Sequence, residues 1–421
     1  MQNGAVHVRK IISGIDIGSD SIKFIVGEIF EGRLHVLSAS KFRNSGIERG
    51  KVVDEDAAVD SIKKAIEDAR EVLSVDIDKC ILGLNMINAR IAKSENSIKI
   101  ENESHMITGQ AISTLMTRAV DGKIPQDFVL AGVIPIEFVL DENKIVERPI
   151  GMKSENLKMR SLVVALPRDY VSVMLDLVNK SGLKVIDVVP NAVGDYYAFK
   201  NHSLDEQSGA IINLGNEATT ISIFDKGELE NTSMFPLGGK NIVKDISYLA
   251  KIGDREAYAV YKDIVLANSR LANPNEYRIV VDLNGEKIKI NQFDISEVAS
   301  SRIDEILNLV KKQINVLTKR EISYIIVTGG LTELRDFKLS LERAFGKNAN
   351  LGKLNVLGAR DNSYSSAIGI IQFFEKKLDL KGKGYSIFND SEIVNMTNSY
   401  NERDLDNNSL LSKVFGYFFD N

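Results

Sequence analysis

Residues 12–26 read ISGIDIGSDSIKFIV and decide the fold of this chain, because residues 210–223, AIINLGNEATTISI, repeat the same pattern. In each copy a β-branched run ends in a short polar residue, and a glycine follows two positions later. A polar triplet, a second apolar run and a glycine turn come next. This pattern predicts two strands around a tight loop, closed by a hairpin.

The tight loop of each copy is suited to holding phosphate. Gly18 and Gly215 let the backbone approach an anion without a Cβ in the way. Successive N–H groups that point in one direction form an anion-binding nest. A chain with two such hairpins can therefore hold one polyphosphate from opposite sides.

Length, charge and cysteine content narrow the class of protein. A chain of 421 residues exceeds what one core usually covers, so we expect two lobes of about 200 residues each. A formal net charge of −5 argues against a nucleic-acid-binding protein, which is usually basic. The single cysteine, Cys80, excludes an intramolecular disulfide and fits a reducing compartment. Residues 1–10 are polar, without a signal-peptide core, so we expect a cytoplasmic protein.

Apolar periodicity divides the chain into lobes and subdomains. A helix at 54–73 and buried strands at 79–84 and 161–166 give the first lobe an α/β pattern. The predicted units are listed here: first-lobe core 1–84, with 161–189 and 361–378; inserted α+β subdomain 85–160; second-lobe core 190–245, with 303–360; small subdomain of the second lobe 246–302; disordered linker 379–408; and amphipathic helix 409–421.

Further glycines lie where ligands bind in α/β sheets. The strand at 322–327 runs directly into Gly329 and Gly330, at the carboxyl end where such sheets bind their ligands. Gly238 and Gly239 precede a helix, whose N-terminus is another place for phosphate. A plain strand-ending turn and a plain helix start remain the alternatives. Small residues at 363–369 begin a helix and suit close packing at a hinge.

The C-terminus carries an apolar helix face after a polar stretch. Residues 379–408 are rich in Asn, Asp, Ser and Lys, which is typical of disorder. Ser409 can cap a helix whose one face gathers Leu410, Leu411, Val414, Phe415 and Phe418. We expect this face to bind a membrane surface. The alternatives are a groove in the core and a protein partner.

Four motifs in order carry a family resemblance: residues 14–23, 212–220, 235–239, and 327–330 with 364–369 after it. Together they resemble the two phosphate loops, connecting segments and adenosine motif of the actin-like ATPase superfamily. The inserted module, the tethered terminal helix, Arg49-Gly50 and residues 182–185 resemble in particular the FtsA family of bacterial cell division proteins.

The resemblance implies an α/β, actin-like (ribonuclease H-like) two-lobe ATPase fold with an inserted α+β subdomain in the first lobe. It implies ATP between the lobes, with Mg²⁺ held by Asp16; the alternative role for Asp16 is that of a turn former after a strand. Lys23 would reach phosphate or lie on the polar face of a strand. The implied nucleotide-binding residues are Asp16, Gly18, Ser19, Lys23, Asn213, Gly215, Asn216, Gly238, Gly239, Gly329 and Gly330.

The resemblance also implies partners and a location. Such a protein self-associates into filaments, anchors the FtsZ ring to the inner face of the cytoplasmic membrane at the division site, and meets other division proteins. Its small subdomain takes the FtsZ C-terminal tail, and Arg302 and Glu305 fall at that interface. The alternative for these two charges is a solvated helix face.

The second loop departs from the family pattern. Asn213 stands where an Asp is usual, and a neutral amide can neither act as a general base nor hold Mg²⁺ by charge. Glu217 adds a carboxylate that would repel phosphates. We therefore expect nucleotide binding with little or no hydrolysis.

Three other functions fit parts of the sequence. A PilM-like type IV pilus assembly protein shares the actin-like fold but lacks a terminal membrane helix. A sugar or acetate kinase needs a base in the cleft, against which Asn213 argues. A heat-shock-type chaperone needs a substrate-binding β-domain after the ATPase, for which the chain is too short.

Overall fold

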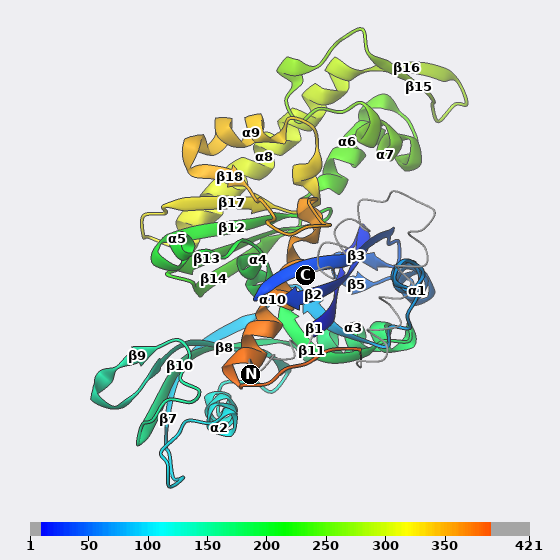
Figure 1. Cartoon of the computed structure of the whole chain (residues 1–421). Helices are drawn as coiled ribbons and strands as arrows, with labels where there is room; N and C mark the ends of the chain where they lie inside the picture. The colour runs from blue at the N-terminus through cyan, green and yellow to red at the C-terminus, as the bar shows by residue number, and fades with distance from the viewer. Residues whose placement is uncertain (1–9, 389–421) are drawn as a thin grey trace, which may run out of the picture.

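The computed structural model describes residues 10–388, which form two lobes (Figure 1). A cleft lies between the lobes. The residues predicted to bind a membrane, Leu410, Leu411, Val414, Phe415 and Phe418, lie outside this range. Within residues 10–388, no helix combines the length and the apolar character that crossing a bilayer requires.

The first lobe is built on a five-stranded sheet in the order β11-β6-β1-β2-β3. The first three strands in sequence form antiparallel pairs, whereas β6 and β11 join in parallel. Helix α1 (Glu55–Leu73) buries its apolar stripe on β2 and β3, as its spacing predicts, and Asp54 caps it by accepting the Ala57 N–H. The strands are β1 (Lys10–Ile17), β2 (Ser21–Phe30), β3 (Arg33–Arg43), β6 (Lys79–Leu84) and β11 (Lys184–Pro190).

The second lobe repeats this topology. Its sheet has the order β14-β13-β12-β17-β18, with the same succession of antiparallel and parallel neighbours. Asp16 ends β1 and Asn213 falls at the equivalent place in β12, so the repeat seen in the sequence is a repeat of structure. The strands are β12 (Ser208–Leu214), β13 (Thr219–Asp225), β14 (Glu228–Phe235), β17 (Tyr324–Thr328) and β18 (Ala349–Leu351).

The edge strand of the second-lobe sheet is β18, residues 349–351, which pairs in parallel with β17. Helix α9 (Phe337–Phe345) precedes it and follows a 3₁₀ turn at Gly330–Glu333 and a left-handed Asp336.

The inserted subdomain is a separate sheet in the order β7-β10-β8-β9, with helix α2 (Gly109–Ala119) and its own core. Residues 161–166 are predicted to belong to the first-lobe core, and Leu162, Val164 and Leu166 are buried in that core. They continue β10, which pairs with β7 on one side and β8 on the other along its length. The strands are β7 (Arg90–Lys99), β8 (Phe128–Val139), β9 (Ile145–Val146) and β10 (Asn156–Pro167).

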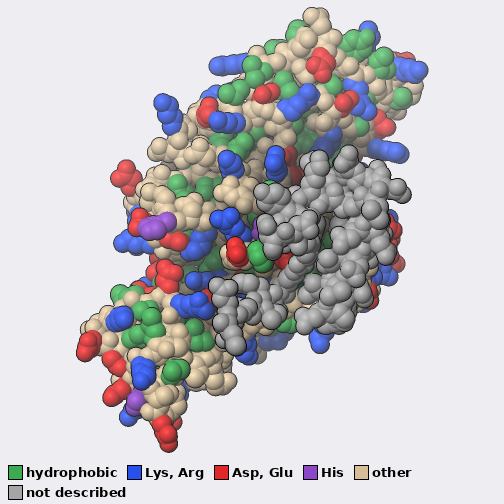
Figure 2. Space-filling model, viewed as in Figure 1, with side chains coloured by type: hydrophobic (Ala, Val, Ile, Leu, Met, Phe, Trp, Pro, Cys, Tyr) green, Lys and Arg blue, Asp and Glu red, His purple; other side chains and the backbone are tan. Residues whose placement is uncertain are grey.

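The inserted subdomain projects from the body but also contacts the second lobe (Figure 2). Lys93 of β7 pairs with Glu230 of β14 at 2.8 Å, and Arg160 of β10 reaches Glu228 at 3.3 Å. On the face shown in Figure 2, basic and acidic side chains are interspersed rather than gathered by sign. The subdomain is therefore inserted in the sequence of the first lobe and forms ion pairs with the second lobe.

The outer end of the second lobe holds helices α6 (Gly239–Ala250) and α7 (Asp254–Asp263) and a hairpin of β15 (Tyr277–Val281) and β16 (Lys287–Asn291). The long helix α8 (Gln292–Leu317) continues from this end onto the main sheet. Helices α6 and α8 thus run without a break through residues 246 and 302, the bounds predicted for the small subdomain.

Two helices cross between the lobes. Helix α4 (Asn191–Phe199) follows β11, and α10 (Ser365–Leu380), orange in Figure 1, packs on α4 and on the first-lobe sheet. A Cβ on Gly369 would lie 1.7 Å from the Gly194 carbonyl oxygen, so the two backbones are in contact. The small residues at 363–369 therefore serve the close packing that the sequence predicts.

The chain after α10 does not leave the body where expected. The linker had been placed from residue 379, but α10 extends to Leu380, and Ile387 and Phe388 are buried in the first-lobe core. The Ile387 N–H donates to the Ile11 carbonyl at 2.8 Å. These two apolar side chains explain the difference, and the remainder of the predicted linker, from residue 389, lies outside the described residues.

Shorter elements complete the description. They are β4 (Ile47–Glu48), β5 (Lys51–Val52), α3 (Arg168–Lys180) and α5 (His202–Glu206).

Candidate functional site

The cleft between the lobes is lined by both repeated loops and by the strand end of β17. All but one of the predicted nucleotide-binding residues lie on its wall: Asp16, Gly18, Ser19, Lys23, Asn213, Gly215, Asn216, Gly239, Gly329 and Gly330. The exception is Gly238, which sits behind the second loop. A Cβ there would lie 2.4 Å from the Gly215 carbonyl oxygen, so its role is to let the helix start approach that loop.

The first loop is a closed turn whose acid faces the cleft. The Gly18 N–H donates to the Ser21 carbonyl at 3.2 Å, and Asn44 Nδ2 donates to the Gly18 carbonyl at 2.7 Å. Lys23 lies opposite Asp16 in the β1–β2 register, and its Nζ is 3.4 Å from Asp16 Oδ2. Lys23 thus faces the cleft beside the carboxylate.

The second loop rests on the N-terminus of α6. The Gly215 N–H donates to the Ala218 carbonyl at 3.0 Å, which closes the turn. The Gly239 N–H donates to the Gly215 carbonyl at 3.1 Å, and the Lys240 N–H to the Asn216 carbonyl at 2.8 Å. The position of the loop is therefore fixed by a helix end of the same lobe.

Glu217 is not the unbalanced negative charge that the sequence suggests. Its carboxylate pairs with Lys240 Nζ at 2.5 Å and accepts the Arg49 N–H from the first lobe. Lys240 also pairs with Glu48 at 3.0 Å. Because a cation lies against the carboxylate, the expected repulsion of phosphate is offset, and the same contacts join the lobes across the cleft.

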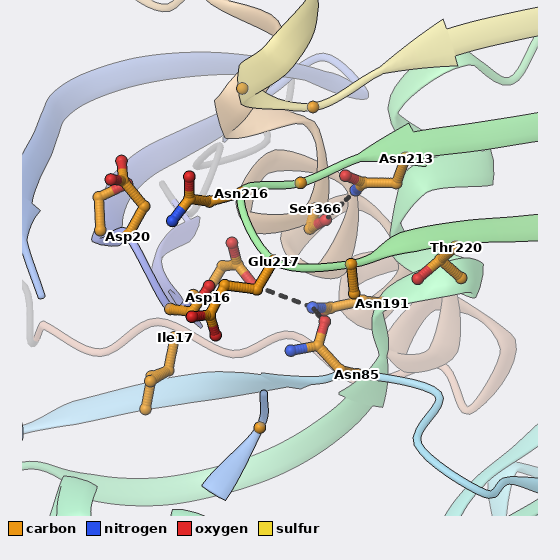
Figure 3. Close-up of a pocket in the computed structure, with 18 of the residues that line it drawn as sticks. Asp16, Ile17, Asp20, Asn85, Asn191, Asn213, Asn216, Glu217, Thr220 and Ser366 are labelled. Atoms are coloured by element: carbon orange, nitrogen blue, oxygen red, sulfur yellow. Dashed lines mark hydrogen bonds between the residues drawn. The ribbon is translucent and has the colours of Figure 1, made fainter. Parts of the chain in front are cut away.

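Helix α4 contributes residues that the sequence reasoning missed. Asn191 Nδ2 donates to Asp16 Oδ1 and to Asn85 Oδ1, both at 2.9 Å (Figure 3). Asn85 and Asn191 directly follow the parallel strands β6 and β11, so both lie at the carboxyl edge of the sheet. Their position directly after a buried strand is the sequence signal by which Asn85 and Asn191 could have been identified.

Asp195, one turn further along α4, is a buried acid on the cleft wall. Asn213 Nδ2 donates to its Oδ2 at 2.8 Å, and the hydroxyls of Ser365 and Ser366 donate to its Oδ1 at 2.9 and 2.8 Å. Burial raises the pKa of Asp195 to about 6, although the three hydrogen bonds act in the opposite direction. No sequence motif marks this residue.

The Gly329-Gly330 turn brings backbone close to the second loop. Gly329 has φ +96°, which favours glycine, and a Cβ there would lie 2.5 Å from Asn213 Oδ1. Nearby, Tyr258 of α7 lines the cleft and carries the Arg43 guanidinium 4.8 Å from its ring centre. Gly329 is thus required by its surroundings, beyond ending a strand, whereas a Cβ on Gly330 would meet nothing within 4 Å.

The site has features that suit a nucleotide with Mg²⁺. Two glycine loops from different lobes line one cleft, where their backbone can closely approach a phosphate. The first N–H groups of α6 are taken by carbonyl oxygens of the second loop. Asp16 offers a carboxylate there, which is the kind of ligand that Mg²⁺ takes together with phosphate oxygens. Within residues 10–388, no three His, Cys, Asp or Glu side chains are grouped as a metal site.

The two predicted partner-binding residues lie on α8, away from the cleft. Arg302 makes a two-pronged contact with Asp245 of α6, at 2.7 Å from Nε and 2.9 Å from Nη2, and also contacts Glu305. The Glu305 side chain is half exposed, at 51%. Arg302 therefore links α8 to α6 within the lobe.

Two family models match the chain. "Cell division protein FtsA" matches residues 210–369, and "SHS2 domain inserted in FTSA" matches residues 88–165. Together they span more than half of the chain, and the second agrees with the inserted sheet, including most of β10.

Curated relatives match over most of their length. The cell division protein FtsA of Bacillus subtilis (strain 168) is 25% identical over 91% of this chain and 86% of its own. FtsA of Streptococcus pneumoniae is 26% identical over 86% and 79%, and FtsA of Escherichia coli (strain K12) is 21% identical over 87% and 90%.

Solved structures share the actin-like fold. A PilM–PilN type IV pilus biogenesis complex aligns with a TM-score of 0.58 at 12% identity, over 88% of this chain and 98% of that one. MreB5 of Spiroplasma citri bound to AMPPNP aligns with a TM-score of 0.52 at 13% identity, over 88% and 97%. The fold is thus the predicted actin-like one, and with both FtsA models and these relatives in agreement, the chain belongs to the FtsA family of cell division proteins.

Proposed function

We propose that this chain binds ATP with Mg²⁺ in the cleft, assembles into filaments, and anchors the FtsZ ring to the inner face of the cytoplasmic membrane at the division site. The observation that carries the nucleotide part is the pair of repeated loops that face one cleft from two lobes. MreB5, which shares the fold, was solved with AMPPNP, which supports a nucleotide in this position. Membership of the FtsA family supports the division role.

In this proposal different cleft residues bind the metal, the phosphates and the adenosine. Asp16 holds Mg²⁺, and the glycine loops around Gly18 and Gly215 hold the phosphates with backbone N–H groups. Gly329 and Gly330 pass beside the adenosine. Bound Mg²⁺ would offset phosphate charge; the chain's own residues bind and orient the nucleotide.

We further propose that hydrolysis is slow or absent. Asn213 is neutral, and its amide group donates to Asp195 and Ser366, so it cannot take a proton from water. Phosphate release by the purified protein measures this directly. Steady release that Asp16→Ala abolishes would contradict the proposal of weak hydrolysis.

The proposed FtsZ contact lies on the small subdomain, at about residues 246–302, with Arg302 and Glu305 at its edge. The exposed carboxylate of Glu305 is the accessible half of this pair. Glu305→Lys should weaken binding of an FtsZ tail peptide, measured by fluorescence polarisation. Glu342→Lys, on α9, is the control for a change of charge elsewhere on the same lobe.

The proposed membrane contact is made by residues 409–421 through Leu410, Leu411, Val414, Phe415 and Phe418, at the end of a linker. Deleting Ser409–Asn421 should release the protein from liposomes, because these large apolar side chains provide the burial. Flotation that the deletion leaves unchanged would contradict the proposal.

Co-sedimentation tests the whole assignment. The full chain, liposomes and FtsZ are combined with and without ATP, and the proposal expects FtsZ in the liposome fraction only when the chain is present. Other division proteins can be added to the same assay. The PilM-like alternative predicts binding to the tail of a pilus membrane protein instead, and a pull-down with both peptides separates the two.

A further inference from the structure

Helix α4 holds the ends of both central strands with two residues of one face. Asn191 and Asp195 are four positions apart and therefore lie one turn apart on the same side of the helix. Asn191 contacts Asp16 at the end of β1, and Asp195 contacts Asn213 near the end of β12. The helix that connects the lobes is thus bonded to both phosphate loops.

The chemistry of the two contacts is reversed. In the first lobe the strand carries the carboxylate, Asp16, and the helix carries the amide, Asn191. In the second lobe the strand carries the amide, Asn213, and the helix carries the carboxylate, Asp195. Because Asp16 and Asn213 are equivalent in the repeat, the acid that the second loop lacks lies 2.8 Å away, on the neighbouring helix.

The contacts of Asp195 also fix the direction of the Asn213 amide. Asn213 Nδ2 donates to Asp195 and, at 3.3 Å, to Ser366, so both of its N–H bonds are used. The oxygen Oδ1 points to the other side, next to Gly329. A flipped amide would set Oδ1 against a carboxylate, which only accepts hydrogen bonds, so Asp195 opposes the flip.

We propose that Asp195 is a positioning residue of the nucleotide site, which supplies from α4 the carboxylate that the second loop lacks at Asn213 and orients Asn213 for nucleotide-bound Mg²⁺. The inference rests on the proposed nucleotide binding. Asp195 acts through Asn213, Ser365 and Ser366, which join β12 to the start of α10. We therefore expect the charge of Asp195 to affect the binding of Mg²⁺ more than the binding of the nucleotide base.

The experiment compares ATP binding with Mg²⁺ and with EDTA, by calorimetry on the full chain. Asp195→Asn removes the charge at constant size and should reduce the tightening by Mg²⁺ by about tenfold, while the affinity in EDTA stays within about twofold. The double variant Asp195→Asn/Asn213→Asp exchanges acid and amide, and should restore the tightening. Asp205→Asn, an acid outside the cleft on the same side of the hinge, is the matched control and should leave it unchanged.

The outcomes separate the two proposals. If the unaltered chain binds no ATP, the proposed function itself fails. If it binds, and Asp195→Asn keeps the full Mg²⁺ effect, Asp195 is not a positioning residue. If Asp195→Asn loses its cooperative melting transition, the double variant replaces it in the test. A double variant that regains the tightening of ATP binding by Mg²⁺ supports the inference. A double variant that folds but lacks this tightening overturns the inference.

Discussion

Gly194 of α4 and Gly369 of α10 lie backbone against backbone, and this contact sets the distance between the two helices at the hinge. A methyl group on Gly369 would lie 1.7 Å from the Gly194 carbonyl oxygen, and one on Gly194 would lie 2.8 Å from Ile370 Cγ2. Neither can be accommodated without moving a helix.

Gly369→Ala should therefore destabilise the protein. Overpacking against rigid backbone costs about 1–3 kcal/mol and sometimes more, so we expect the free energy of unfolding to fall by at least about 2 kcal/mol. Urea denaturation followed by circular dichroism measures it. Gly132→Ala on β8 is the control, because a methyl group there meets Pro190 Cδ at an ordinary 3.4 Å. Equal stability of the two variants would contradict the close contact.

Glu217 should slow the exchange of nucleotide. Its carboxylate bonds the Arg49 N–H across the cleft and pairs with Lys240, so Glu217→Gln weakens a contact that holds the lobes together. For an ion pair worth about 1 kcal/mol, we expect about fivefold faster release of a fluorescent ATP analogue, measured by stopped flow. Glu342→Gln, which weakens an ion pair with Lys338 inside α9, is the control. A slower release from Glu217→Gln would count against this role.

Cys80 should be unreactive in the folded protein. It is fully buried in β6, and burial raises the pKa of its thiol well above the ordinary value, so the reactive thiolate is scarce. A thiol reagent at pH 8 should label it only after urea unfolds the chain. Labelling of the native protein at the rate of the unfolded one would show that the strand opens.

The Asp141 carboxylate should make the inserted subdomain sensitive to acid. Its Oδ2 accepts the Glu155 N–H at 2.6 Å and the Ser154 hydroxyl at 2.8 Å, and these bonds lower the pKa of Asp141 from 3.8. A lowered pKa means that the contribution is complete above about pH 4 and is lost as the pH falls through the folded-state pKa. Protection of the backbone N–H groups of residues 154–156 from hydrogen exchange, taken relative to the intrinsic rate at each pH, should fall on acidification, and Asp141→Ala should lower this protection at neutral pH. An unchanged rate in that variant would rule the carboxylate out.

Local pattern predicted the two repeated glycine loops, because the glycines and the apolar runs act over a few residues. It could not find Asn191 and Asp195, since their partners are more than 15 residues away and only the fold brings them together. It also misjudged Glu217, whose charge is balanced by Lys240 from another element. Local pattern also does not show that residues 161–166 continue a strand of the inserted sheet, because the pairing of β10 with β7 and β8 is set by the fold.

The ion pair between Lys93 and Glu230 joins a projecting subdomain of one lobe to the edge strand of the other. Any rotation of the lobes about α4 and α10 would lengthen or break this pair. The inserted subdomain would therefore shift relative to β14 when the cleft opens or closes. The separation of β7 and β14 would therefore report the state of the cleft from outside it, in a single molecule or in a filament.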